Sequence, residues 1–406
     1  MGTVIMEDAA PTFERLQGRL GEIQATLRDA GLDGWLLFDV YARNKVAMGL
    51  LGFGEQKRRY FAWIPATGEP VALMHGIEEG PWARWPWTRR RYVAWRELDE
   101  VLSELLGQAK RVAMEVSPGD AVPALDLVPA GVVELVEKAG PEVVSSGDLI
   151  TRFYSAWTPE QLAAHRRTAE TLADVAGEAF AELAGRVAAG EAVTEAEMRR
   201  WVLGRLEARG AGVGADCIVA TGVSAADPHY HPVEGGTVFR RGDVVLIDLW
   251  SKEAEDAAYA DQTWMGYLGA EVPEKVAEVF GVVRDARDAA VEFLRRRWAE
   301  GTPVQGYEVD DVCREVIERH GYGKWFIHRT GHSIDRSTHG MGPNMDNLET
   351  HEVRTLIPGV GFSIEPGIYL PEELGVRSEI NVYIGEEGPE ITPSEIQHEV
   401  FTLLDD

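Results

Sequence analysis

The chain has 406 residues, more than one ordinary hydrophobic core supports, so we expect two or three domains. Hydrophobic residues make up 45% and charged residues 26%, which argues against a disordered chain, and the longest apolar runs, 34–40 and 244–250, are too short to span a membrane. The net charge of −27 argues against a nucleic-acid-binding protein, because phosphate recognition needs a basic surface.

Two further features concern the cellular compartment. Residues 1–12 have no basic start followed by an apolar block, as a secretory signal would. The two cysteines, Cys217 and Cys313, lie in apolar stretches and offer no disulfide framework. We therefore expect a cytoplasmic protein that does not bind membranes.

Residues 1–155 predict alternating helices and strands. A helix is expected over 13–30, because apolar residues recur on one face and Gly31 provides a stop. Apolar runs then predict a helix at 96–106 and strands at 35–38, 60–64, 71–74 and 111–114. This alternation predicts a small α/β domain with a mixed sheet.

Tryptophans and arginines are interleaved in segment 82–95. Such a pattern can stack single-stranded bases, but the overall acidity of the chain disfavours that interpretation. We expect a surface loop that packs on a neighbouring domain or subunit.

The pattern changes near residue 155. Thr158, Pro159 and Gln161 have the spacing of a capping box and predict a long helix that ends near residue 188. A second helix is expected from Thr194 to Gly210, followed by strands at 217–221, 243–250 and 258–267.

The same order of elements then recurs at an offset of about 115 residues. Helices are expected at 273–298 and 309–320, followed by strands at 325–329, 361–369 and 376–384. Residues 156–406 are therefore predicted to be a duplicated helix–helix–sheet unit, in which both copies are needed to close one core.

Acidic residues occupy matching places in the two copies. Asp248 and Asp261 are 13 residues apart in the first copy, and Glu365 and Glu379 are 14 apart in the second. Four buried carboxylates repel one another and are costly to desolvate, whereas two divalent cations would neutralise all four. His332 follows Gly331, whose backbone permits a close approach, and is the natural nitrogen ligand.

Several ordered motifs here resemble a known family. They are 242–248 (Gly-Asp-Val-Val-Leu-Ile-Asp), 261–263 (Asp-Gln-Thr), 331–332 (Gly-His), 365–369 (Glu-Pro-Gly-Ile-Tyr) and 375–379 (Gly-Val-Arg-Ser-Glu). Residues 156–406 resemble the pita-bread metallopeptidases. The whole chain resembles their Xaa-Pro branch, the prolidases and Xaa-Pro aminopeptidases, in which a creatinase-like N-terminal domain precedes the α/β (α+β) pita-bread domain.

The resemblance implies a dinuclear metal site and a role for each motif residue. Five side chains would hold two Mn²⁺, Co²⁺ or Zn²⁺ ions, with a hydroxide in the bridging position: Asp248, Asp261, His332, Glu365 and Glu379. Glu365 would relay protons, His339 would stabilise the oxyanion, and His231 and His328 would position the ends of the substrate. Arg377 would pair with an acid or with a substrate carboxylate. The substrates would be proline-containing dipeptides or short peptides, and the protein a homodimer.

Some alternatives stay open at this level. His229 follows Pro228 and competes with His231 for one role. Trp250, Trp264 and Asp335 replace the family's usual Gly, Arg and Gly, which puts the shape of the pocket in doubt. A metal-free, creatinase-like C–N hydrolase and a non-catalytic peptide-binding module are the rival functions. The sequence does not distinguish a dipeptidase from an aminopeptidase.

Overall fold

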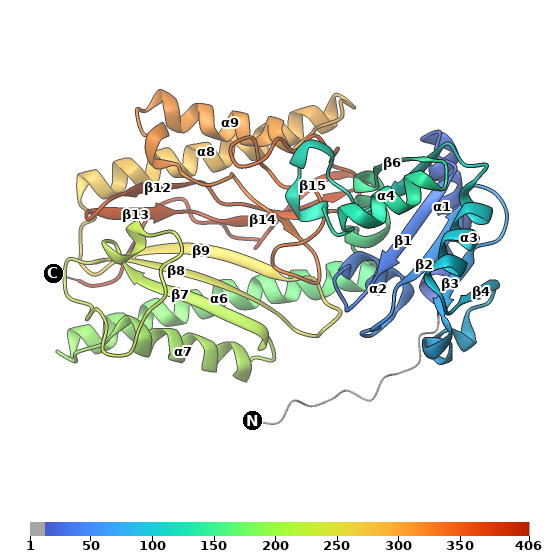
Figure 1. The fold of residues 1–406 in the computed structure, drawn as a ribbon. Helices are drawn as coiled ribbons and strands as arrows, with labels where there is room; N and C mark the ends of the chain where they lie inside the picture. Colours follow the sequence, from blue (N-terminus) through green and yellow to red (C-terminus); the bar gives the residue numbers. More distant parts are fainter. Residues whose placement is uncertain (1–12, 406) are drawn as a thin grey trace. The chain divides into compact units, whose positions relative to one another are not determined.

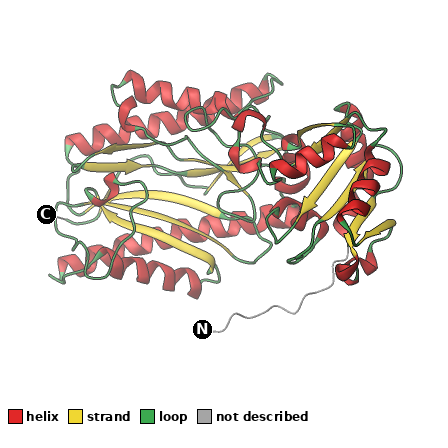
Figure 2. Cartoon of the chain, viewed as in Figure 1, coloured by secondary structure: helices red, strands yellow, loops and turns green. Residues whose placement is uncertain are grey.

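The computed structural model describes residues 13–405, so segment 1–12, where no signal sequence is expected, lies outside it. The chain divides into two compact units, Met1–Tyr154 and Ser155–Asp406 (Figure 1). Each unit combines helices and strands (Figure 2). Within the described residues, no helix has the length and apolar character needed to cross a membrane.

The N-terminal unit is built on one six-stranded sheet with the order β4-β3-β2-β1-β5-β6. Its strands are β1 (Gly34–Asp39), β2 (Tyr60–Pro65), β3 (Val71–His75), β4 (Thr88–Tyr92), β5 (Arg111–Met114) and β6 (Glu142–Ser145). Its helices are α1 (Glu14–Asp29), α2 (Lys45–Leu51), α3 (Trp95–Leu106), α4 (Ala130–Lys138) and α5 (Gly147–Ile150). Strands β1 to β3 are antiparallel and the other pairings are parallel, so the expected mixed sheet is confirmed.

The tryptophan- and arginine-rich segment 82–95 was wrongly predicted to be a surface loop. It contributes to a short 3-10 helix, Gly80–Arg84, and to the edge strand β4. Trp82 and Trp85 are buried, and the Trp82 ring lies 4.4 Å from the ring of Phe53. These two tryptophans therefore fill the core of their own unit, where large aromatic side chains remove the most apolar surface from water, whereas Trp95 is exposed.

The first half of the C-terminal unit follows the predicted order. Its elements are α6 (Pro159–Ala188), α7 (Glu195–Ala208), β7 (Val213–Thr221), β8 (Val244–Lys252) and β9 (Ala260–Tyr267). The predicted capping box is confirmed, because Thr158 accepts a hydrogen bond from the backbone of Gln161, whose side chain bonds back to Thr158. Strand β8 lies between β7 and β9 and is antiparallel to both. A short strand, β16 (Phe401–Thr402), extends this sheet beside β9.

The second half repeats the arrangement with shorter strands. Its elements are α8 (Glu274–Ala299), α9 (Gly306–Arg319), β10 (Ser333–Ile334), β11 (Gly361–Ile364), β12 (Gly367–Leu370), β13 (Leu374–Arg377), β14 (Ile380–Gly385) and β15 (Gly388–Thr392). Helices α6 and α7 cover the outer face of the β7–β9 sheet, and α8 and α9 lie on the opposite side of the unit (Figure 1). The inner face of β7–β9 shares a hydrophobic core with α8, α9 and β11–β14.

Three predicted strands of the second half differ from the structure. Residues 325–329 form no strand, because the side chain of Arg314 takes the carbonyl groups of Phe326 and His328 as hydrogen-bond acceptors. The strand expected over 361–369 is interrupted between β11 and β12, where Pro366 lacks a backbone donor. The strand expected over 376–384 is interrupted between β13 and β14. Both interruptions fall at acidic residues of the candidate site.

Candidate metal centre

Two of the acidic residues lie on adjacent strands, on the inner face of the first sheet. Neighbours of Asp248 along β8, such as Ile247 and Leu249, pack with α6 and α7 on the outer face. Strand alternation therefore turns Asp248 inward. In the β8–β9 register, Asp248 lies opposite Thr263 and Asp261 lies opposite Trp250. Both aspartates consequently face the second half of the unit, and both are buried.

The other two acids stand at the breaks between short strands. Glu365 directly follows β11, and Glu379 lies between β13 and β14. The Thr263 hydroxyl donates a hydrogen bond of 2.9 Å to Glu379, which joins the two halves of the unit. Glu379 is buried, whereas the side chain of Glu365 is 15% exposed. In the first half, the acidic side chains project from intact strands. In the second half, they lie at interruptions between strands.

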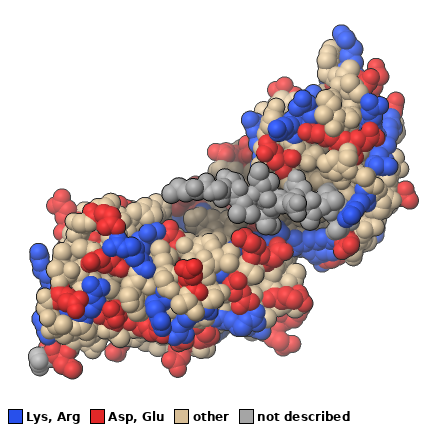
Figure 3. All heavy atoms as spheres, turned by 90° about the horizontal axis from the view of Figure 1, so that it is seen from below, with Lys and Arg blue, Asp and Glu red and all other residues tan. Residues whose placement is uncertain are grey.

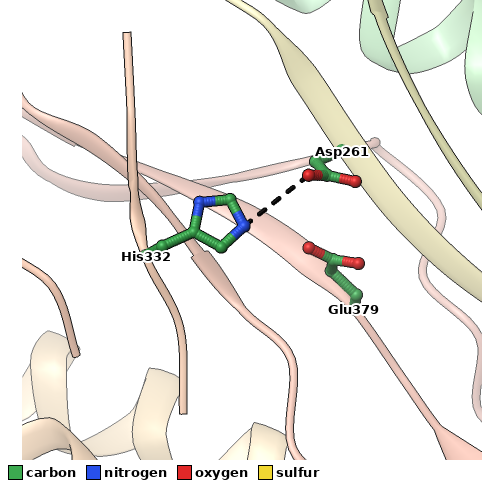
Figure 4. Close-up of side chains that lie close together, drawn as sticks. All are labelled: Asp261, His332 and Glu379. Carbon is green, nitrogen blue, oxygen red and sulfur yellow. Dashed lines mark ion pairs between the residues drawn. The ribbon is translucent and has the colours of Figure 1, made fainter. Parts of the chain in front are cut away.

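His332 directly precedes the short strand β10, which pairs with β11. A Cβ atom at Gly331 would lie 1.9 Å from the carbonyl oxygen of Ser363, so only glycine fits before the histidine. The Nε2 atom of His332 lies 3.3 Å from Glu365. It lies 3.6 Å from Asp261, a pair that Figure 4 marks with a dashed line. Burial lowers the pKa of His332 to about 3. Its ring is therefore neutral, and because Nδ1 faces the Ser333 carbonyl oxygen at 3.2 Å, Nε2 is left to bind a cation.

The cluster has the composition and the unmet charge of a cation site. Ligand atoms of Asp261, His332 and Glu379 all lie within 4.8 Å of one another, and their side chains converge in Figure 4. Among the described residues, Oδ1 of Asp248 and Oε1 of Glu379 are buried without a hydrogen-bond partner. Oxygen ligands with one imidazole suit Mn²⁺, Co²⁺ or Zn²⁺. The residues present therefore fit a divalent metal.

Burial also perturbs the ionisation of the acids. Desolvation raises the pKa of Asp248 to about 6, against the opposing effect of Arg377. Desolvation, followed by repulsion from neighbouring acids, raises the pKa values of Asp261 and Glu379 well above the ordinary range. Without a counter-charge, burial therefore favours the protonated forms of these carboxyl groups.

Arg377 supplies one fixed counter-charge. Its Nη2 atom donates to Asp248 at 2.5 Å, its Nε atom donates to Thr263 at 2.9 Å, and its Nη1 atom donates to the Tyr369 hydroxyl at 3.1 Å. An acid or a substrate carboxylate was expected to pair with Arg377, and in the structure an acid, Asp248, does so. The Tyr369 hydroxyl lies 2.8 Å from Nε2 of His328, so a hydrogen-bonded chain runs from His328 to Asp248. Sequence reasoning did not identify Thr263 and Tyr369 as site residues, although both stand inside the quoted motifs.

The remaining candidate histidines lie toward solvent. His339 is exposed on one side, and its ring centroid lies 4.4 Å from that of His332 in an edge-to-face arrangement. Partial desolvation lowers the pKa of His339 to about 4, with smaller contributions from nearby charges that include His229. His229 and His231 are both exposed.

Comparison with known proteins identifies the family of the chain. Residues 165–386 match metallopeptidase family M24. The chain belongs to that family. A probable dipeptidase PepE from Mycobacterium tuberculosis is 27% identical over 392 residues, which cover 95% of this chain and 96% of the relative. An Xaa-Pro dipeptidase from Pyrococcus furiosus is 33% identical over 207 residues, or 50% of this chain and 55% of the relative.

Solved structures confirm the fold class of this M24 metallopeptidase. Dipeptidase PepE from Mycobacterium ulcerans superposes with a TM-score of 0.70 at 24% identity, covering 96% of this chain and 98% of the other. A prolidase from Thermococcus sibiricus superposes with a TM-score of 0.65 at 22% identity, covering 95% and 98%. The predicted pita-bread fold is therefore correct, and membership of the family implies a divalent metal cofactor.

The three departures from the family motifs differ in their distance from the chemistry. Trp264 points to the outer face of β9, where its indole donates to Gln262 and stacks on Phe401. Trp250 stands on the same face as the acids, directly opposite Asp261. Asp335 is buried in the loop before His339. Trp264 therefore leaves the metal centre untouched, and Trp250 changes its lining.

Proposed function

We propose that this M24 member is a dinuclear metallopeptidase that hydrolyses Xaa-Pro bonds in dipeptides or short peptides. The observation that carries the proposal is the group of four acids near His332, three of them buried, in which two carboxylate oxygens lack a partner among the described residues. Two divalent cations would neutralise that charge. The proposed ligands are Asp248, Asp261, His332, Glu365 and Glu379.

The substrate class rests on the relatives. Several related proteins carry the name Xaa-Pro dipeptidase or putative Xaa-Pro aminopeptidase, at 29% to 35% identity. The amide nitrogen of an Xaa-Pro bond carries no hydrogen, so peptidases that must bind a substrate N–H group at that position do not accept Xaa-Pro peptides.

We further propose a cytoplasmic homodimer. Acidic and basic side chains are interspersed over the surface seen in Figure 3.

The chemistry divides between the cations and the side chains. When bound, the cations would activate a water molecule and polarise the scissile carbonyl group. Glu365 is the least buried of the four acids, which suits exchange of a proton with the reacting groups and then with the leaving amine. His339 faces solvent beside His332 and would donate a hydrogen bond to the developing oxyanion.

Two further histidines are proposed to position the substrate. His328 is held by the Arg329 carbonyl group and the Tyr369 hydroxyl, so its ring has a fixed orientation. For the second position we propose His231, with His229 as the competing candidate, since both side chains are exposed. Arg377 is proposed to keep Asp248 ionised, since it bonds to that carboxylate directly.

A product survey tests this function. Protein purified without chelators would be assayed for metal content and then for hydrolysis of Ala-Pro, Ala-Pro-Ala and Ala-Ala with Mn²⁺, Co²⁺ or Zn²⁺. We expect about two metal ions per chain and cleavage of a proline-containing peptide in preference to Ala-Ala. Cleavage of Ala-Pro alone indicates a dipeptidase, and cleavage of the tripeptide indicates an aminopeptidase. Metal-loaded protein that cleaves none of them would refute the proposal.

A further inference from the structure

The loop 335–341 presents His339, and a buried carboxylate closes it. Asp335 is 3% exposed. Its Oδ1 atom accepts a hydrogen bond of 2.8 Å from the backbone N–H of Ser337, and its Oδ2 atom accepts one of 3.0 Å from the backbone N–H of Met341. The two oxygens of one side chain thus hold both ends of the segment that contains His339.

The surrounding structure also holds the backbone at the start of this loop. The backbone N–H of Tyr259 donates to the carbonyl oxygen of Asp335 at 3.0 Å. Lys252, which is 5% exposed, donates to the carbonyl oxygen of Arg336 at 2.9 Å. A Cβ atom at Gly340 would lie 2.9 Å from the carboxylate carbon of Asp335. The side chain of Asp335 therefore fills the inside of the loop.

We propose that Asp335 is a positioning residue that orients His339 for the reaction, an inference that rests on the proposed function. Charged acceptors make stronger hydrogen bonds to backbone N–H groups than neutral ones do. Two such bonds restrict a loop whose histidine is exposed and packs its ring against His332. A catalytic group held in place before the substrate arrives needs no ordering during the reaction. Glycine, the family's usual residue at this position, offers neither acceptor.

The first test compares two aspartate variants. Asp335→Asn keeps the size of the side chain but removes one of its two acceptors. We expect kcat to fall by roughly tenfold or more while KM and metal content change little. Asp39→Asn is the control for the same substitution at a buried site away from His339: Asp39 accepts two backbone N–H bonds from a loop of the N-terminal unit, both at Oδ1, which asparagine retains. That variant should keep the kcat of the parent protein.

A double-mutant cycle tests whether Asp335 acts through His339. Adding Asp335→Asn to His339→Ala should lower kcat no further than His339→Ala alone, because the two residues serve one function. Additive losses would overturn the proposal. So would an Asp335→Asn variant with unchanged kcat.

Hydrogen exchange supplies a measurement that does not depend on turnover. In Asp335→Asn, the amides of 335–341 should exchange at least tenfold faster, while segments elsewhere keep their rates. Unchanged exchange in 335–341 would overturn the positioning inference even in an active enzyme. If Asp335→Asn shows the expected faster exchange but the parent protein cleaves no peptide, the proposed function is refuted and the structural role of Asp335 is not.

Discussion

Glu115 in the N-terminal unit and the acids of the metal centre are compensated in different ways. In the N-terminal unit, Glu115 is fully buried and accepts hydrogen bonds from Trp35 at 2.6 Å, Asn44 at 2.7 Å and Ser146 at 3.1 Å. Both of its oxygens are therefore satisfied by protein donors. In the metal centre, by contrast, Asp248 and Glu379 each retain a buried oxygen that has no donor in the described part of the chain.

The difference separates a structural acid from a ligand. Burial raises the pKa of Glu115, and its three hydrogen bonds oppose that shift. The donors make the ionised form tolerable without any added ion. The acids of the metal centre have one another as neighbours, so their charge remains for cations to neutralise. A buried acid alone does not indicate a metal site, whereas a group of buried acids with unpaired oxygens does.

The largest expected effect is on a ligand. Replacing Asp261 with Ala removes a carboxylate whose ligand atom lies within 4.8 Å of those of His332 and Glu379. We expect bound metal to be lost and peptidase activity to fall by roughly a hundredfold or more. Metal analysis and steady-state kinetics on the same preparation measure both effects. Full activity in this variant would remove Asp261 from the ligand set.

The next effect concerns stability after metal removal. Because the pKa of Asp248 is raised to about 6, the folded metal-free protein binds more protons than the unfolded chain between about pH 4 and pH 6. The stability that protonated Asp248 gives to the folded metal-free protein is fully present at low pH. It is lost as pH rises through about 6, and the loss for this one group is about 3 kcal/mol. The Tm of chelated protein should therefore fall over that range.

Calorimetry at several pH values measures this loss. Asp248→Asn should flatten the pH dependence of the chelated protein, because the substituted group does not titrate. Added Mn²⁺ should raise Tm most above pH 6, where the ligands are ionised. A chelated parent protein and an Asp248→Asn variant with parallel Tm profiles would argue against the raised pKa.

The smallest expected effect on activity comes from the satisfied acid. Glu115→Gln turns an acceptor into a donor that faces other donors, so we expect a loss of about 1–3 kcal/mol in the free energy of unfolding. Metal content and kcat should remain those of the parent protein. Denaturant unfolding and the peptide assay measure the two properties. A Glu115→Gln variant that loses metal would erase the contrast between the two regions.

Sequence patterns predicted the elements whose signals are local. The capping box at Thr158, the apolar run of β8 and the matching acids of the two copies required no knowledge of tertiary structure. The strands expected at 361–369 and 376–384 are each divided into two shorter strands that belong to different sheets. Apolar character alone does not reveal where a chain passes from one sheet to another. Residues 325–329 failed for a similar reason, since the distant side chain of Arg314 binds their carbonyl groups.

Within the site, sequence reasoning identified candidate ligands but not their supports. Tyr369 and Thr263 belong to recognised motifs, yet nothing in their spacing predicts that both bond to Arg377. The burial of Glu115 and its three donors depends on segments up to 80 positions apart in the chain. The orientation of Trp264 is the exception, because strand alternation alone turns it away from Asp261.

The packing inside loop 335–341 predicts that residues 335 and 340 covary among related sequences. Any side chain at Gly340 would displace the Asp335 carboxylate, and a loop without that carboxylate has no need of a bare backbone there. Relatives should therefore exchange these two positions together, so that an aspartate at the first is accompanied by a glycine five residues later. A collection of sequences in which the two vary independently would mean that the loop is stabilised by other means in those proteins.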